Sequence, residues 1–308
     1  MKLKSHFLIA ATIVIAASLF NSCKKDNSPA TPADTTVEAQ SQSSDQTLYT
    51  NESDAVTDDV NAALDTDGGS FNGRVYGTAT PPISFVLACD VAVAVDTMST
   101  PHTITLTYSG NNCNSTRRRS GTVTVAFSSN FKWAAAGARL TVTFNNLKIT
   151  RLSDNKSIVI NGVRTITNVS GGLLRNLASL DSIVQTVNDA NMSVTFDNTA
   201  QRTWQNSIKR VFTYNNGIVV SFTGSSNGVN RFGHNFNSTI TQPLVVAQSC
   251  NFRYTSGQVQ STGSLVTTTT TFGLDSSGNA VSDCPAVLYY KIVWTGALGN
   301  SLSYTGSY

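Results

Sequence analysis

Hydrophobic and polar residues alternate with a period of two along most of the chain after Gly69. Between residues 102 and 108, large apolar side chains alternate with threonines, and residues 121–127 repeat the pattern. Such alternation places one set of side chains on each face of a strand, so it predicts half-buried β-structure. Between residues 139 and 149 the alternation changes phase at Asn145-Asn146, which predicts a β-bulge.

The remaining alternating segments extend this pattern to the C-terminus. Further strands are predicted at 157–168, 191–197, 207–214, 217–223, 229–241, 245–255, 257–272, 286–295 and 301–306. Asn161-Gly162 and residues 215–217 are typical turn sequences. Residues 173–190 lack the alternation, and their leucines indicate one short helix or an ordered loop. The predicted fold class is all-β, with antiparallel sheets forming a large sandwich or an open, curved meander.

The N-terminus has the features of an export signal. Lys2 and Lys4 precede residues 7–20, which carry no charge. A helix of that length spans about 21 Å, short of a bilayer core of about 30 Å, so it is typical of a cleaved signal peptide. The peptide ends in Ser22-Cys23, a small residue before a cysteine, as in a lipobox, although Phe20 departs from its usual leucine. We therefore expect a signal peptide at 1–22 and a lipidated Cys23 that anchors the protein to a membrane.

Charge divides the rest of the chain into two parts. Residues 23–67 hold ten acidic residues and two lysines, a net charge of −8, whereas residues 68–308 have a net charge of +9. The first part is rich in Ser, Thr, Pro and Gln, which predicts an acidic flexible spacer. A short helix is predicted near 53–65, because Val56, Val60 and Leu64 share one helical face. The second part, 68–308, is predicted to be one all-β domain.

The positive charge of the β domain raises the question of its partner. Arg117, Arg118 and Arg119 form its one basic run, and a solvated basic turn is the simplest interpretation. Anionic glycans, lipopolysaccharide phosphates or the chain's own acidic segment fit the charge as partners. An exported protein rarely meets nucleic acid, so we expect no nucleic-acid partner.

Apart from Cys23, four cysteines remain. They are Cys89, Cys113, Cys250 and Cys284, an even number that predicts two disulfides in an exported protein. Cys89 and Cys113 flank a pair of predicted strands, which favours the pairing 89–113 and leaves 250–284. Closely spaced cysteines that would bind a metal are absent from the sequence, and we expect neither a metal nor an organic cofactor.

Residue types that carry catalysis are scarce. Glutamate occurs twice, at Glu38 and Glu52 in the spacer, and histidine occurs only at His102 and His234 after the signal peptide. The eight aspartates of the β domain leave one catalytic hypothesis, a glycan-active or ester-cleaving hydrolase that uses two carboxyls on sheet loops.

Other residues are candidates for binding or modification. Trp133, between Lys132 and an Ala-Ala-Ala-Gly loop, and Tyr289 are candidates for an exposed surface on which a sugar could stack. The three arginines 117–119 are candidates for an anionic ligand. Thr35, within Asp-Thr-Thr, resembles the sites at which Bacteroidota attach O-glycans.

A series of short motifs follows the same order as in a group of β-rich Bacteroidota lipoproteins. The series comprises Cys89-Asp90, Cys113, Arg119-Ser-Gly-Thr-Val, Asn161-Gly-Val-Arg-Thr-Ile-Thr-Asn168, Phe222-Thr-Gly, Asn230-Arg-Phe-Gly, Pro243-Leu, Cys250, Ser256-Gly and Asp283-Cys284. The Cys23-Lys-Lys-Asp start is also typical of these proteins. The chain resembles this group over about 85–295. The resemblance implies a β fold and an outer-membrane location that faces either the periplasm or the cell surface, and it implies no chemistry.

These observations favour a lipid-anchored protein of the outer membrane or cell surface without catalytic activity. Its β domain is expected to bind a glycan, a surface polymer or another envelope protein, or to have a structural role in the envelope. The hydrolase described above is the alternative.

Overall fold

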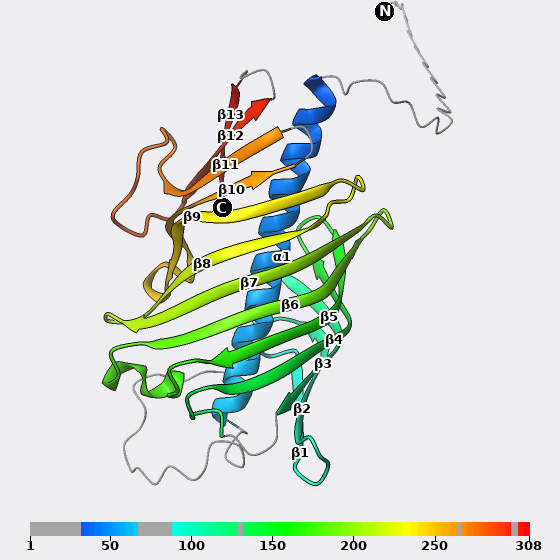
Figure 1. Cartoon of the computed structure of the whole chain (residues 1–308), viewed down its shortest axis with the longest axis vertical. Helices are drawn as coiled ribbons and strands as arrows, with labels where there is room; N and C mark the ends of the chain where they lie inside the picture. The colour runs from blue at the N-terminus through cyan, green and yellow to red at the C-terminus, as the bar shows by residue number, and fades with distance from the viewer. Residues whose placement is uncertain (1–31, 67–87, 128–131, 264–265, 297–300) are drawn as a thin grey trace, which may run out of the picture. The chain divides into compact units, whose positions relative to one another are not determined.

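The computed structural model describes residues 32–66, 88–127, 132–263, 266–296 and 301–308. In these ranges thirteen strands form one antiparallel sheet, and each strand pairs with its neighbours in sequence order. The strands are β1 (Val91–Asp96), β2 (Thr103–Asn111), β3 (Arg117–Phe127), β4 (Ala138–Arg151), β5 (Ser157–Asn168), β6 (Ile183–Phe196), β7 (Gln201–Tyr214), β8 (Ile218–Val229), β9 (Asn235–Ala247), β10 (Arg253–Thr262), β11 (Val266–Leu274), β12 (Tyr289–Gly296) and β13 (Ser301–Ser307). The all-β prediction is confirmed, in the form of an open, curved meander (Figure 1).

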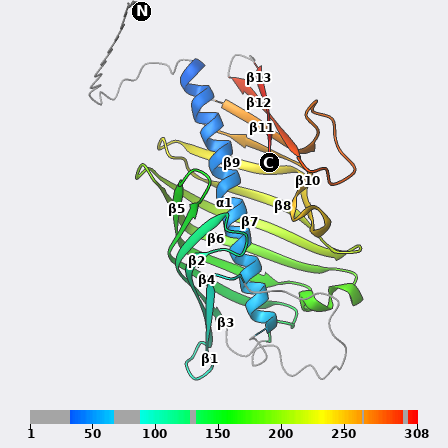
Figure 2. The same cartoon turned by 180° about the vertical axis from the view of Figure 1, so that it is seen from behind.

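Within the described ranges a single α-helix, α1 (Pro32–Thr66), crosses the strands steeply on the inner side of the curved sheet (Figures 1 and 2). The short helix predicted near 53–65 is present and extends back to Pro32, so most of the segment predicted as a flexible spacer is helical. Tyr49, Val56 and Leu64 are buried in the main core together with residues of the sheet. The helix and the sheet therefore belong to one compact unit.

Bulges bend the sheet around α1. Among the strand pairs from β3–β4 to β8–β9, every pair except β7–β8 contains a shift in register. The β9–β10 pair also contains shifts. The bulge predicted at Asn145-Asn146 is confirmed between Phe144 and Leu147, and Asn146 has a φ of 49°. An extra residue in one strand increases the local twist and bends that strand. Repeated bulges thus turn a long meander into a curved cover for the helix.

The inner face of the sheet follows the predicted alternation. On β4, Leu140, Val142 and Phe144 are buried, and after the bulge Leu147 and Ile149 take over the same face. These residues join the main core around α1, while a second apolar cluster covers the region from β7 to β11. The core therefore lies on the concave side, between helix and sheet.

Polar residues on the inner face explain most differences from the predicted strands. Residues 183–190, predicted as helix or loop, form the first half of β6. The sequence pattern did not indicate this strand, because the buried Gln185 and Asp189 interrupt its apolar alternation. The helical part of that region is a short 3-10 helix at Leu174–Ser179. Asn161-Gly162 lies within β5 in place of the predicted turn, opposite bulges whose extra residues lie in β4 and β6, and Gly162 has a φ of 136°.

Candidate functional site

Basic residues of the sheet and of the loop between β8 and β9 bind the acidic side chains of α1. Ion pairs join Arg117 to Glu52, Arg119 to Asp59, Arg210 to Asp54 and Arg231 to Asp45, and the His234 ring lies within hydrogen-bond distance of Glu38. Because these pairs are distributed from one end of α1 to the other, they fix the helix along its length. The chain's own acidic segment was one of the anionic partners expected for the basic domain. The structure places this segment against the domain.

The Arg117–Arg119 run lies in β3, and the interpretation as a solvated basic turn is wrong. Arg119 is buried, and its guanidinium donates to Asp90 through Nε at 2.7 Å and through Nη2 at 2.6 Å. Arg117 donates to Glu52, and only Arg118 is exposed. The run extends along a strand, so alternate side chains turn toward the helix.

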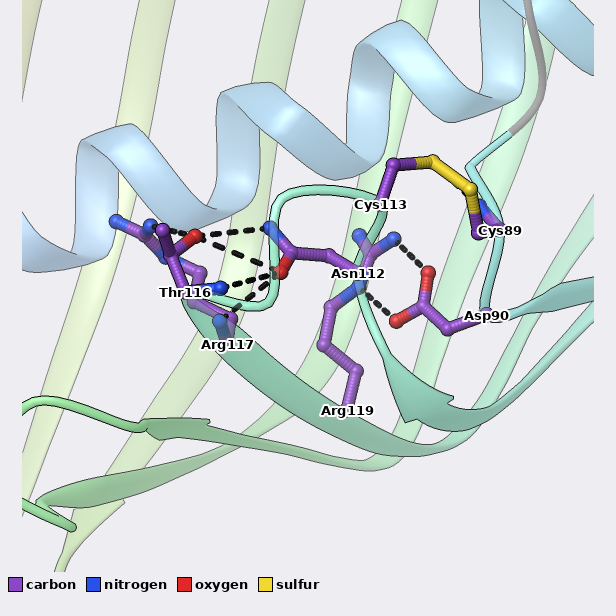
Figure 3. The surroundings of a disulfide bond; sticks show 7 residues. All are labelled: Cys89, Asp90, Asn112, Cys113, Thr116, Arg117 and Arg119. Carbon is purple, nitrogen blue, oxygen red and sulfur yellow. Dashed lines mark hydrogen bonds and ion pairs between the residues drawn. A yellow bond between two sulfur atoms is a disulfide. The ribbon is translucent and has the colours of Figure 1, made fainter.

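Both predicted disulfides are present. Cys89 and Cys113 have Cα atoms 5.1 Å apart, and Cys250 and Cys284 have Cα atoms 5.2 Å apart. Figure 3 shows the first bridge beside the Asp90–Arg119 pair, so the link closes the turn that positions Asp90. Cross-links of this kind are typical of exported proteins.

The two aromatic residues expected to form a stacking surface do not form one. Trp133 has 3% of its surface exposed and belongs to the main core. Its carbonyl accepts a hydrogen bond from Asn168 Nδ2 at 2.9 Å, which fixes the loop before β4. Tyr289 is half-buried on β12, where it pairs with Leu274 and Ser307. The prediction of an exposed Trp133 is wrong because its loop folds inward onto the core.

Most aspartates of the β domain already have partners. Asp90 and Asp189 pair with buried arginines, and Asp154 pairs with Arg151. Asp275 accepts backbone hydrogen bonds within its own turn, as its sequence predicts. These contacts give the carboxyls structural roles. Within the described ranges, His, Cys, Asp and Glu side chains form no cluster that could hold a metal ion.

A cavity of about 90 Å³ lies between α1 and strands β5–β11. One part of its wall is apolar and comprises Phe222, Ile240, Leu244, Tyr254, Val259 and Phe272. Another part consists of side chains that carry hydrogen-bonding groups. These are Gln46, Asp54, Asn206, Arg210, Ser226, Ser238 and Ser261. A space this size holds several waters, at roughly 10–15 Å³ each, or one slim chain. An apolar wall with a few polar groups is typical of a site for an amphipathic small molecule.

The cavity wall is arranged in rows across neighbouring strands. Ser226 pairs with Ser238, which pairs with Ser261, so hydroxyls from β8, β9 and β10 lie side by side. In the adjacent apolar part, Phe222 on β8 pairs with Leu244 on β9. The serine row and the apolar row are therefore separate zones of the same curved sheet, while Arg210 on β7 pairs with Phe222 of the apolar row.

A second hollow of about 340 Å³ opens between the helix, strands β4–β6 and the loops that follow β6 and β8. Phe196 and Ile158 contribute apolar surface, while Arg151, Lys156 and Asp197 contribute charge. Asp197 accepts hydrogen bonds from the backbone N–H and the hydroxyl of Ser157, which lower the pKa of its carboxyl below 3.8. The volume of this hollow is larger than that of the cavity, and more charged residues line it.

Several residues expected to have functions lie at the N-terminus of the chain. Cys23 and the predicted signal peptide, 1–22, lie outside the described residues. Thr35 lies in the first turns of α1. In the part of the chain that the structure describes, no helix is both long enough and apolar enough to cross a membrane.

Neither cavity was predicted from the sequence, although some of the motifs described above contain residues that hold the helix. Asn230 donates to Glu38 through Nδ2, and its neighbour Arg231 pairs with Asp45. Arg164, within the Asn161–Asn168 motif, donates to the Ser53 carbonyl at 3.0 Å. Isolated polar residues in strand-like segments were the available signal for these contacts. They did not identify their partner, because the helix that they contact lies more than a hundred residues away in the sequence.

Comparisons with protein-family models, with curated proteins and with solved structures find no match for this chain.

Proposed function

We propose that the protein is a lipid-anchored, non-catalytic binding module of the outer membrane, and that its ligand site is the cavity between α1 and β5–β11. The observation that carries this proposal is the division of the cavity wall into an apolar zone and a polar zone. A wall of this kind suits a small amphipathic molecule, because apolar burial supplies affinity and a few polar groups supply orientation. The aspartates' structural contacts support a binding role over a catalytic one.

A fluorescent apolar probe tests this site. N-phenyl-1-naphthylamine, which is neutral, is expected to fluoresce more strongly when added to the chain from residue 24 onward. Val259→Trp fills the cavity from β10 and should abolish the increase. Val163→Trp is the matched control, because Val163 is 38% exposed on β5 and outside the cavity. No fluorescence increase with the unmodified protein, or equal binding by the Val259→Trp variant, would contradict the proposal.

The proposed anchor has its own test. Cys23→Ala removes the thiol that a lipid would modify, so the variant should move from the membrane fraction to the soluble fraction. If the variant stays in the membrane fraction, Cys23 is not the anchor. Protease treatment of intact cells then distinguishes a surface location from a periplasmic one.

The second hollow supports a second candidate ligand, a glycan. Arg151, Lys156 and Asp197 surround an apolar patch that includes Phe196, and polar groups around an apolar floor suit a sugar. Screening the protein against a glycan array, with Lys156→Ala as the variant, tests this candidate. Binding that the variant does not weaken would exclude this hollow as its site.

A further inference from the structure

Phe232 lies exposed at the tip of the loop between β8 and β9, with 45% of its surface in contact with solvent. Asn230 closes this loop, because its Oδ1 accepts hydrogen bonds from the backbone N–H groups of Phe232 and His234, each at 3.0 Å. The Asn230 N–H donates to the His234 carbonyl at 2.8 Å, and the Gly233 N–H donates to the Asn230 carbonyl at 3.0 Å. The loop is therefore ordered by its own hydrogen bonds and presents an apolar ring to solvent.

The first turns of α1 are attached to this loop. Glu38 Oε1 accepts a hydrogen bond from Asn230 Nδ2 at 2.6 Å and lies 2.9 Å from His234 Nδ1. Val37, the residue before Glu38, has 56% of its surface exposed. Val37 and Phe232 are far apart in the sequence, but one carboxylate joins the two segments that carry them. The start of α1 and the β8–β9 loop thus form one corner of the molecule with an exposed apolar side chain on each segment.

The charged groups of this corner have partners within the protein. Arg231 pairs with Asp45, and its guanidinium lies 4.0 Å from the centroid of the Phe196 ring. Glu38 accepts the hydrogen bond from Asn230 described above. A charge without a partner resists transfer from water to an apolar environment. The corner can therefore approach a bilayer without leaving Arg231 or Glu38 uncompensated.

The position of Cys23 in the sequence determines which part of the protein a lipid anchor would hold near a membrane. Residues 24–31 separate Cys23 from Pro32, the first residue of α1, and a chain of this length reaches at most about 32 Å. The helix has 35 residues, so its far end lies about 52 Å beyond Pro32. An anchor at Cys23 keeps the start of α1 close to the bilayer and places no such limit on the end of the helix.

Phe252 provides a comparison at the opposite end of β9. It lies between β9 and β10 and is 45% exposed, the same fraction as Phe232. β9 has 13 residues, so the loops before and after it are about 43 Å apart. The two phenylalanines therefore agree in residue type and exposure and differ in their distance from the start of α1.

We propose that the corner formed by the start of α1 and the β8–β9 loop rests on the membrane surface, with Phe232 and Val37 at the boundary between lipid head groups and acyl chains. Neighbouring exposed apolar side chains are typical of membrane or protein contacts, and apolar groups gain free energy when they leave water. Two side chains bind a bilayer weakly, but an anchor at Cys23 raises their effective concentration at its surface. This inference rests on the proposed function, because it requires the lipid anchor.

A lipid tether attached in vitro tests the contact. The other four cysteines form disulfides, so Cys23 of the chain from residue 23 onward can be coupled to a maleimide lipid in phosphatidylcholine vesicles. Phe232→Trp places a fluorescent ring at the loop tip, and Val37→Trp places one on α1. On tethering, the emission of both variants should shift to shorter wavelength, and vesicles with brominated acyl chains should quench it. The native tryptophans are buried, and the unmodified protein supplies their emission for subtraction.

Phe252→Trp is the matched control, and its emission should be neither shifted nor quenched. Equal quenching of the variants at 232 and 252, or quenching of neither, overturns the inference. An emission shift of Phe232→Trp that grows with protein concentration in the absence of vesicles assigns the corner to a contact with a second copy of the chain, and this result also overturns the inference.

Failure of the membrane contact is distinguishable from failure of the anchor. If Cys23→Ala stays in the membrane fraction of cells, the anchor is wrong and the inference fails with it, whatever the tethered vesicles show. If Cys23→Ala leaves the membrane fraction but tethering changes neither the Phe232→Trp nor the Val37→Trp emission, the anchor stands and only the contact is wrong.

Discussion

Arg164 on β5 and Asp189 on β6 form a two-bonded ion pair beneath α1. Nε of Arg164 is 2.6 Å from Oδ1 of Asp189, and Nη2 is 2.8 Å from Oδ2. The helix completes the arrangement, because Arg164 Nη1 donates to the Ser53 carbonyl and Tyr49 donates to Asp189 at 2.7 Å. Burial alone would raise the pKa of Asp189, but Arg164 and the hydrogen bonds lower it below 3.8. The pair thus joins the helix to two strands in the core.

Removing one member of this pair should be costly. Arg164→Met leaves the carboxylate of Asp189 buried without its cation, and we expect a loss of about 3–5 kcal/mol in the free energy of unfolding. The double variant Arg164→Met/Asp189→Leu should recover part of that loss, because no isolated charge remains. Urea unfolding measures both. Asp154→Asn, in the exposed Arg151–Asp154 pair, is the control and should change stability little. Equal losses in the single and double variants would contradict this explanation.

Asp59 should give the protein a pH dependence of the opposite sign to that of Asp189. Burial raises the pKa of Asp59 above 3.8, although Arg119 and Tyr108 oppose the change. The folded state therefore holds this proton more tightly than the unfolded chain, and stability from Asp59 is lost as pH rises from 3.8 through the folded pKa. Asp59→Asn removes that loss, while Arg119 keeps its two bonds to Asp90.

Urea unfolding at about pH 4 and about pH 7 tests this sign. The stability of Asp59→Asn relative to the unmodified protein should improve with rising pH. For Asp189→Asn a further measurement at about pH 3 should show the reverse trend, because the lowered pKa of Asp189 means that its contribution is lost as pH falls below 3.8. The same trend in both variants would show that the opposite pKa shifts do not control stability.

The strands that could be predicted are those in which apolar residues occupy most of the inward positions. On β5, Ile158, Ile160 and Ile166 are buried, and the strand has the predicted bounds of 157 and 168. The first half of β6 was missed because Gln185 and Asp189 point inward, where a sequence pattern assigns polar residues to the solvent face. These polar side chains can point inward because they have partners on another strand or on α1. The spacing of residues along the chain does not reveal such partners.

For the candidate site, the sequence predicted only the opposite net charges of the two segments that form it. The opposite net charges of 23–67 and 68–308 indicated that the acidic segment could bind the β domain, but they did not locate the contacts. Asn230 and Arg231 were assigned to a strand, yet they lie outside the strands, between β8 and β9, where they bind Glu38 and Asp45. The cavity exists only because α1 lies along the bent sheet, so no local pattern could indicate it.

Helix α1 should be required for the β-sheet to fold. A chain that begins at residue 68 would leave Arg119, Arg164 and Arg210 without the helix groups that they contact, and would expose the apolar surface that covers Tyr49. We expect no cooperative unfolding transition for 68–308, in contrast to 32–308. Adding a peptide of residues 32–66 should restore the transition, since the contacts are noncovalent.

A peptide in which the acids at 45, 52, 54 and 59 are replaced by their amides is the control, and it should restore little. Far-ultraviolet circular dichroism during urea titration follows both mixtures. If 68–308 alone unfolds at the same urea midpoint as 32–308, the helix is dispensable and the sheet is an independent domain.

Gly224 should tolerate no side chain. Its φ is 133°, and a Cβ there would lie 2.1 Å from the Ser207 carbonyl oxygen on the neighbouring strand. Gly224→Ala therefore forces the β7–β8 pair apart, and we expect a loss above about 2 kcal/mol in the free energy of unfolding. Gly233 has a φ of 82° but open space around it, so Gly233→Ala should cost about 1 kcal/mol. Urea midpoints compare the two variants, and equal losses would show that contact with β7 is unimportant.

The disulfide between Cys89 and Cys113 should be energetically coupled to the neighbouring Asp90–Arg119 pair. Cys89→Ser/Cys113→Ser opens a loop of sequence separation 24. We expect it to lower the free energy of unfolding by about 3 kcal/mol, through the greater freedom of the unfolded chain. In the folded protein the bridge also holds the turn that carries Asp90 (Figure 3). Asp90→Asn should therefore cost less without the bridge than with it. A double-mutant cycle measures this coupling, and strictly additive losses would mean that the bridge does not position Asp90.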